Sequence, residues 1–295
     1  MRGLKVPVVD GAVRTKAGDR LAYAQTGRLD GAPLFYFHGV PGSRLDLCQP
    51  LYRAALDEAC VRLVGIDRPG YGGSTHRGGR RYGDWPADVL AVADELGIDR
   101  FGILAYSTGG PYAVACALAF PDRLSFVGIV SGIGPAETPR RSEGMARSIV
   151  TAIGLSKRLP SAARWMVKHT SVERFSRQFD RDLCPVDRAL YRDPDVRQSV
   201  VDAFTEATRG GSHGWVEDFR LMGTPSGLDY AAVRCPIRLW HGEADATVPV
   251  HHGKHVAGLL PGAKLDVLPG VGHLHSLDRW TAFFGTARDA IGRQR

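Results

Sequence analysis

The sequence LAYSTGG at residues 104–110 lies between a short apolar run of strand length and an alanine-rich stretch typical of a helix. A sharp turn from strand to helix presents the residue at its tip, and it needs small residues two positions before and after that tip. Gly109 meets this need, and Ala105 stands where the pattern usually has glycine. The stretch therefore predicts that Ser107 occupies the tip of such a turn, with its hydroxyl presented to a substrate.

Similar apolar runs recur along the chain, and helix-like stretches separate them. Strands are expected at residues 33–37, 61–66, 101–105, 124–130, 237–240 and 264–268, after a leading hairpin within 6–25. Helices are expected at residues 86–96, 108–120, 250–260 and 277–291. Strands that are apolar on both faces and alternate with helices are typical of a mostly parallel sheet covered on both sides. The pattern therefore predicts an α/β fold.

One long segment, residues 135–230, interrupts this alternation. It contains no clear buried strand and its aromatic residues recur at intervals, so we expect several helices inserted between two strands of the sheet. The predicted division is a core formed by residues 1–134 and 231–295 and an insertion formed by 135–230. Trp165 and Trp215 either line an apolar substrate cavity or belong to the core of the insertion itself, and the sequence leaves both options open.

A serine hydroxyl is a weak nucleophile unless a neighbouring base removes its proton. The stretch PGVGH follows the last expected central strand and ends at His273, with His275 as an alternative two residues on. The stretch HGEADATVP at residues 241–249 follows the strand before it and offers an acid, either Asp245 or Glu243. Serine, acid and histidine in this chain order predict a catalytic triad in which the acid orients the imidazole.

Such chemistry also needs N–H donors where negative charge develops on the substrate oxygen. The N–H of Thr108, at the start of the expected helix, is one candidate. The loop HGVPG at residues 38–42 follows the first central strand, and the N–H of Val40 is the second candidate. We interpret His38 as a structural residue that braces this loop, and Asp67 as a carboxylate that binds loop backbone.

With these pieces in place, the chain resembles the α/β-hydrolase superfamily. Five motifs carry the resemblance across nearly the whole chain: HGVPGSR at 38–44, DRPGYGGS at 67–74, AYSTGG at 105–110, HGEADATVP at 241–249 and GVGH at 270–273. The resemblance implies an α/β-hydrolase fold with a helical cap formed by the insertion. It also implies a triad of Ser107, Asp245 and His273, because the family places its acid before a VP step and its base directly after a glycine. It implies no particular substrate.

Composition and charge narrow the class of function. The chain has 295 residues, of which 44% are hydrophobic, and a net charge of +7. The basic residues are not clustered as nucleic-acid binding requires, and no apolar run is long enough to cross a membrane, so we expect neither partner. The N-terminal segment lacks the apolar region of a signal peptide, and the five cysteines fit no disulfide or metal framework. The expected location is therefore the cytoplasm.

Cofactor motifs are missing from the sequence. No dinucleotide or phosphate-binding fingerprint occurs, and the histidine cluster at 251, 252 and 255 lacks a further ligand that would complete a metal site. We therefore expect no cofactor and no metal. These three histidines are expected on the solvated surface of a helix.

The sequence as a whole favours a serine hydrolase that cleaves an ester or lactone of a small, partly apolar substrate through an acyl-enzyme. Tyr106, Trp165 and Trp215 are the candidates for substrate contact, and the protein is expected to act as a monomer or homodimer. Three alternatives remain open: a carbon–carbon bond hydrolase, a perhydrolase of the haloperoxidase type, and a ligand-binding member of the fold without turnover.

Overall fold

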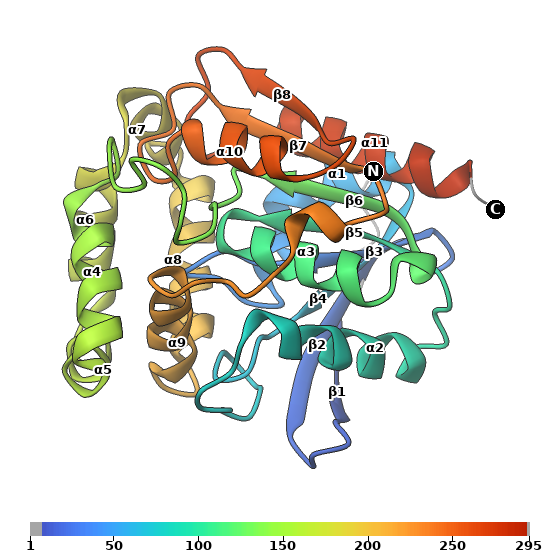
Figure 1. The fold of residues 1–295 in the computed structure, drawn as a ribbon, viewed down its shortest axis with the longest axis horizontal. Coiled ribbons are helices and arrows are strands. Elements are labelled where there is room, and N and C mark those ends of the chain that lie inside the picture. The colour runs from blue at the N-terminus through green and yellow to red at the C-terminus, as the bar shows by residue number, and fades with distance from the viewer. Residues whose placement is uncertain (1–7, 294–295) are drawn as a thin grey trace.

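The computed structural model describes residues 8–293, whose strands form an eight-stranded sheet with helices on both faces (Figure 1). The strands are β1 (Val9–Arg14), β2 (Arg20–Gly27), β3 (Ala32–Phe37), β4 (Val61–Ile66), β5 (Phe101–Tyr106), β6 (Leu124–Val130), β7 (Ile237–Gly242) and β8 (Lys264–Leu268). Their order across the sheet is β1-β2-β4-β3-β5-β6-β7-β8. Only β2 runs antiparallel to its neighbours β1 and β4, and all other adjacent pairs are parallel.

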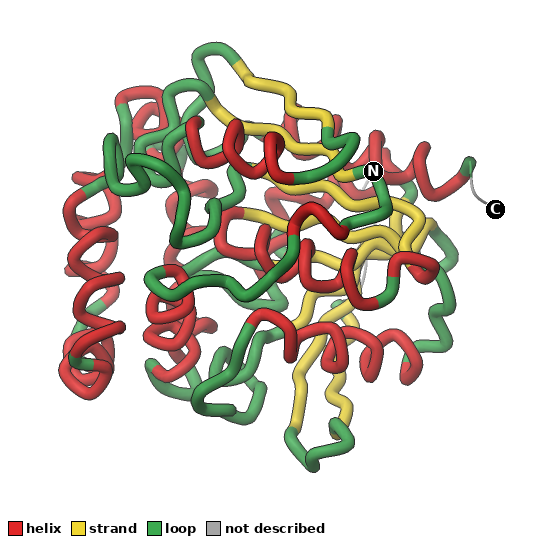
Figure 2. The backbone as a smooth tube through the Cα atoms, in the orientation of Figure 1, coloured by secondary structure: helices red, strands yellow, loops and turns green. Residues whose placement is uncertain are grey.

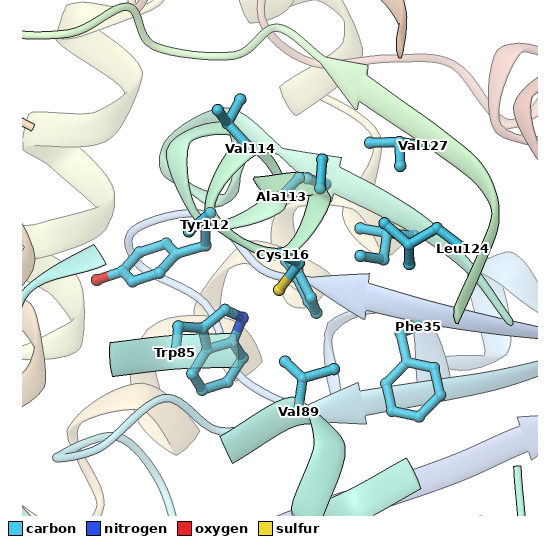
Figure 3. Packing of buried hydrophobic residues seen from close by; sticks show 14 of the residues in the cluster. Phe35, Trp85, Val89, Tyr112, Ala113, Val114, Cys116, Leu124 and Val127 are labelled. Carbon is cyan, nitrogen blue, oxygen red and sulfur yellow. The ribbon is translucent and has the colours of Figure 1, made fainter. Parts of the chain in front are cut away.

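Two layers of helices cover the sheet. The helices α2 (Trp85–Glu95), α3 (Gly110–Ala119) and α10 (His251–Leu259) contribute to the apolar cluster on one face. On the other face lie α1 (Arg53–Ala59) and α11 (Leu277–Gly292), which also contact each other. Figure 3 shows part of the first cluster, in which Trp85, Val89, Tyr112 and Cys116 gather beside Phe35 of the sheet.

Strand β3 shows why the central strands read as continuous apolar runs. Successive side chains of a strand point to opposite faces of the sheet. Phe35 and Phe37 accordingly belong to the cluster around α2 and α3, whereas Leu34 and Tyr36 belong to the cluster around α1 and α11. Because both faces are covered, every one of these positions must be apolar.

Six helices are inserted between β6 and β7, and we call them the cap. They are α4 (Arg147–Arg158), α5 (Pro160–Lys168), α6 (Val172–Asp182), α7 (Pro185–Tyr191), α8 (Pro194–Thr208) and α9 (His213–Met222). They lie together at one end of the sheet, on the left of Figure 1. Residues 131–236 contain helices and loops but no strand (Figure 2). A separate apolar cluster joins Phe219 and Met222 of α9 to Ile133 and Val248 in the loops that follow β6 and β7.

The observed elements confirm the predicted fold class. Each expected central strand and helix is present to within a few residues, and the leading hairpin is β1 and β2. The sequence did not reveal α1, whose seven residues are too short to show a clear helical period. All six cap helices lie within 135–230, and the exact division of the chain into core and cap stays a prediction. Between residues 8 and 293, no helix has both the length and the apolarity needed to cross a membrane.

Candidate active site

Ser107 lies at a sharp turn between β5 and α3. Its backbone has φ +54°, in the left-handed region that non-glycine residues rarely adopt. Such a conformation persists only where the surrounding structure fixes it, and it is typical of functional positions. Two residues on, a Cβ added at Gly109 would lie 2.4 Å from the carbonyl oxygen of Phe37, so only glycine fits there. The turn therefore has the close packing that the sequence predicts.

His273 and Asp245 come to Ser107 from the loops after β8 and β7. The Nε2 atom of His273 lies 3.1 Å from Oγ of Ser107, and its Nδ1 lies 2.7 Å from Oδ2 of Asp245. The other carboxylate oxygen of Asp245 accepts hydrogen bonds from the backbone N–H groups of Thr247 and Val248, at 2.9 and 2.8 Å. The three side chains thus form a continuous hydrogen-bonded chain at the carboxyl ends of the parallel strands.

The electrostatics of the pair suit proton transfer. Burial raises the pKa of Asp245, but the neighbouring His273 and the hydrogen bonds that it receives outweigh this, so its pKa is below the ordinary value. Burial lowers the pKa of His273, but the Asp245 carboxylate outweighs this, so its pKa is raised. Asp245 is therefore held ionised next to an imidazole whose protonated form it stabilises.

The alternative acid, Glu243, and the alternative base, His275, lie outside the hydrogen-bonded triad. Glu243 is exposed to solvent, whereas Asp245 is buried against His273. The Nε2 atom of His275 lies 3.0 Å from Oγ of Ser131, and burial lowers its pKa to about 3. The geometry therefore brings together Ser107, Asp245 and His273, as the resemblance implies.

The loop that carries Val40 follows β3, and Arg68 stabilises it by hydrogen bonds to its backbone. The Arg68 guanidinium donates to the carbonyl oxygens of His38 and Gly39, at 2.6 and 3.0 Å. Burial keeps the pKa of His38 well below its usual value, and its ring lies between Gly39 O (2.8 Å) and Arg68 N (3.4 Å). His38 is thus a neutral brace within the loop. Asp67 also has a bracing role, because it accepts the backbone N–H of Arg44 at 2.7 Å.

One known protein family matches most of this chain. The sequence profile of the Alpha/beta hydrolase family matches residues 34–286, which is most of the chain. The chain belongs to the alpha/beta hydrolase family.

Several known proteins are similar to this chain at low sequence identity. "Uncharacterized hydrolase YcgS" of Bacillus subtilis is 24% identical over 280 residues, which cover 91% of this chain and 93% of the relative. The 2-hydroxy-6-oxo-2,4-heptadienoate hydrolase of Pseudomonas putida is 22% identical over 236 residues, 79% of each chain. The crystal structure of the enol-lactonase from Burkholderia xenovorans LB400 superposes with a TM-score of 0.72 at 18% identity, covering 96% of this chain and 100% of that one. The structural likeness shows the shared fold.

In this alpha/beta hydrolase, a buried charged network ties the cap to the Val40 loop. Asp218 of α9 accepts hydrogen bonds from Arg68 (2.6 Å), Tyr71 (2.8 Å) and Tyr112 (2.6 Å), and it also pairs with Arg80. Burial raises the pKa of Asp218, but the two guanidinium groups outweigh this and hold it well below the usual range. Sequence reasoning missed this residue, because its partners lie more than 100 positions away.

Two cavities meet at the Val40 loop. One, of about 480 Å³, contains Ser107 and His273. The other, of about 380 Å³, extends into the cap and is mostly apolar. Both cavities are lined by Val40, Pro41, Phe179 and Thr247. The half-buried Asp46 adds a polar group to the Ser107 cavity, and burial raises its pKa to about 7.

The three candidates for substrate contact have different positions. Tyr106 lines the Ser107 cavity, and its hydroxyl donates to the carbonyl oxygen of His273 at 2.9 Å. Trp215 lines the cap cavity, where it packs against Phe204. Trp165 lines neither of these two cavities and the residue is 66% exposed, so its position does not support the expected substrate contact, which stays a prediction. An amphipathic helix has one outward face, and Trp165 lies on that face of α5.

The histidine cluster on α10 needs one correction. His252 is buried, not solvated: its ring lies 2.9 Å from the carbonyl oxygen of Arg141 and 3.2 Å from the N–H of Gly134. It therefore fixes the loop after β6 rather than facing water. No group of three or more His, Cys, Asp or Glu side chains arranged to hold a metal ion occurs among residues 8–293.

Proposed function

We propose that this protein is a serine hydrolase that cleaves an ester or lactone of a small, partly apolar substrate through an acyl-enzyme. The observation that carries the proposal is the hydrogen-bonded chain from Ser107 through His273 to Asp245, which opens into a cavity. A serine without function at a helix N-terminus would need neither of these partners nor a strained backbone.

The reaction begins when Ser107 Oγ attacks the substrate carbonyl carbon while His273 Nε2 takes the hydroxyl proton. Asp245 holds the tautomer that leaves Nε2 free and stabilises the imidazolium that forms. The N–H groups of Val40 and Thr108 are the proposed donors to the oxyanion, supported by the position of Thr108 at the entrance to α3.

The tetrahedral intermediate then collapses and expels the alcohol oxygen, to which His273 returns the proton. A water molecule then enters and gives a proton to His273. The oxygen of this water attacks the acyl carbon and forms a second tetrahedral intermediate. The second tetrahedral intermediate then collapses: the bond between the acyl carbon and Ser107 Oγ breaks, His273 returns its proton to Oγ, and the carboxylic acid is released. In a lactone, acid and alcohol leave as one molecule.

The two cavities support a substrate with unlike ends. The cap cavity offers apolar side chains such as Phe175, Phe204 and Trp215, which suit a hydrocarbon group. The Ser107 cavity offers Asp46 and Tyr52, which suit a part that carries hydrogen-bonding atoms. A partly apolar ester with one polar substituent fits this division.

A second candidate function keeps the same residues but cleaves a carbon–carbon bond. It is favoured by the similarity to the heptadienoate hydrolase over 79% of the chain. A perhydrolase and a binding protein without turnover are the further alternatives. A panel of p-nitrophenyl esters, a lactone, a vinylogous diketone, and monochlorodimedone with peroxide separates these four outcomes.

The nucleophile is tested by Ser107→Ala within that panel. Removal of a triad serine lowers turnover by roughly 10⁴-fold or more, because no other group can form the acyl-enzyme. We expect this loss for ester hydrolysis, with an unchanged circular dichroism spectrum and melting temperature. Comparable activity in the variant would refute the assignment.

The location and assembly of the protein are part of the same proposal. All five cysteines are free, which supports a reducing compartment such as the cytoplasm. The site is assembled from one chain, so a monomer could carry the reaction and a homodimer would not be required for it.

A further inference from the structure

Asp187 belongs to the cap, yet it contacts the loop that carries the candidate base. It lies in the first turn of α7, and its side chain is completely buried, with 0% exposure. Its Oδ2 accepts a 2.7 Å hydrogen bond from the backbone N–H of His273, and its Oδ1 accepts a 3.0 Å bond from the N–H of Leu274. The carboxylate therefore holds two successive peptide groups of this loop, 86 and 87 positions away in the sequence.

Arg188, the residue after Asp187, joins α7 to the end of α6 by hydrogen bonds. The Arg188 guanidinium donates to the carbonyl oxygen of Asp180 at 3.1 Å and to that of Leu183 at 2.9 Å. These bonds satisfy carbonyl groups that the end of a helix leaves without partners. Asp187 thus lies in a turn of the cap that is hydrogen-bonded to the preceding helix.

Gly272 explains how the carboxylate comes so close. A Cβ built on Gly272 would lie 2.2 Å from Oδ1 of Asp187, much closer than two such atoms can approach. The glycine before His273 therefore leaves the space that Asp187 fills. A side chain in place of the second glycine of the GVGH motif would therefore displace the Asp187 carboxylate.

Several titratable groups face His273 from the elements around it. They are Asp187 on α7, Asp245 after β7, His241 at the end of β7, Tyr106 at the end of β5, and His275 on the same loop. Burial lowers the pKa of both other histidines and raises that of Tyr106, so these three are uncharged near neutral pH. The charges that act on His273 are therefore the two aspartates, and both raise its pKa.

We propose that Asp187 is a positioning residue for His273: the cap fixes the backbone of the histidine loop, while Asp245 fixes the ring. This inference rests on the proposed function, in which His273 is the base. Its consequence is that the cap forms part of the catalytic apparatus. Movement of α7 away from the sheet would break both hydrogen bonds and release the base from its position.

The test compares three variants in ester hydrolysis across a range of pH. Asp187→Asn removes the charge and one acceptor, and Gly272→Ala displaces the carboxylate but keeps its charge. Asp202→Asn is the matched control, because this exposed cap aspartate bonds only to Gln198 of its own helix among the contacts described.

We expect Asp187→Asn to lower kcat roughly 10- to 100-fold, because a small misplacement of a reacting group has an effect of this size. KM should change little. The loss of a negative charge near His273 should lower the pKa of its imidazole. The acid limb of the pH profile of kcat/KM should therefore move to lower pH, by up to about one pH unit. Gly272→Ala should lower kcat with a smaller movement of the limb, and Asp202→Asn should match the wild type.

A second readout keeps the inference separate from the proposed function. The pKa of His273 can be measured by NMR titration of its ring protons, assigned by their loss in His273→Gln. If the wild type hydrolyses no ester, the proposed function fails, but a lower His273 pKa in Asp187→Asn still supports the positioning role. If Asp187→Asn keeps the kcat, acid limb and His273 pKa of the wild type and loses only stability, Asp187 merely anchors the cap and the inference is overturned. Should Asp187→Asn not fold, a wild-type kcat in folded Gly272→Ala overturns it equally.

Discussion

Asp245 and Asp187 are both buried aspartates that accept hydrogen bonds from His273, but Asp245 lies in the core and Asp187 in the cap. Asp245 belongs to the core and accepts a hydrogen bond from the imidazole ring, whereas Asp187 belongs to the cap and accepts one from the backbone N–H. The pKa of Asp245 is lowered because its partner becomes a cation. The pKa of Asp187 is raised, because burial outweighs the hydrogen bonds that it receives and the charge of His273.

Two aspartates that bind the same histidine can therefore have different roles, depending on whether the imidazole ring or the backbone is the hydrogen-bond donor. A carboxylate that faces a titrating ring takes part in the charge changes of the reaction. A carboxylate that faces peptide groups fixes the path of the chain, and it acts on the ring only through distance and charge. Removing the first should change the chemistry, and removing the second should change how well the chemistry is placed.

The largest effect is expected at Asp245. Asp245→Asn should lower kcat for an ester by about 10⁴-fold, because the amide favours the tautomer that blocks Nε2 of His273. Glu243→Gln is the matched control, since this exposed carboxylate lies five residues before the VP step and has no hydrogen bond or ion pair with His273 among the contacts described. Steady-state kinetics of both variants decide the matter, and the reverse ranking would move the acid to Glu243.

A third buried aspartate, Asp218, should show the largest effect on stability. Asp218→Asn leaves Arg68 and Arg80 buried without their anion, and the loss of one partner of a buried ion pair costs about 3–5 kcal/mol. Urea unfolding measures this directly. Asp202→Asn should lie within about 0.5 kcal/mol of the wild type. A similar small value for Asp218→Asn would show that the network does not hold the cap.

The pH dependence of stability should have opposite signs at the two cap aspartates. The pKa of Asp218 is depressed by folding, so its contribution is present above the unfolded value of about 3.9 and is lost as pH falls toward its folded pKa. The pKa of Asp187 is raised by folding, so its contribution is present below about 3.9 and is lost as pH rises through its folded pKa.

Urea unfolding of Asp218→Asn and Asp187→Asn between pH 3 and pH 8 checks these signs. Relative to the wild type, Asp218→Asn should lose less stability on acidification, and Asp187→Asn should lose less as pH rises. Curves parallel to the wild type in both variants would contradict the assigned pKa directions.

The smallest effect is expected at the tryptophans of the cap. Trp215→Ala enlarges the apolar cavity and should change the ratio of kcat/KM for a long and a short ester by roughly 10- to 200-fold, the range typical of apolar contacts. Trp165→Ala should leave this ratio unchanged, because Trp165 lies outside both cavities. Equal ratios in wild type and Trp215→Ala would assign Trp215 to the core of the cap.

The core half of the site could be predicted from the sequence because local rules determine it. A strand, a sharp turn and a helix place Ser107, and the carboxyl ends of parallel strands bring Asp245 and His273 to the same edge of the sheet. These relations depend on short motifs and on strand alternation, both of which are visible in the residues themselves.

The cap half could not be predicted, because its contacts join segments far apart. Nothing near Asp187 or Asp218 in the sequence indicates a backbone loop or a guanidinium as partner. The inward position of Trp215 and the outward position of Trp165 likewise depend on how α5 and α9 pack together. The prediction that His252 faces solvent was wrong for the same reason, since its partners belong to the loop after β6.

The most direct measurement is the site of reaction with a fluorophosphonate, which labels serine nucleophiles activated by a base. Folded wild type should take up one label, and mass spectrometry of the digested protein should place it on Ser107. Ser107→Ala should take up none, and Asp245→Asn should react far more slowly. If folded wild type remains unlabelled, or if the label lies on another serine, Ser107 is not the nucleophile of this protein.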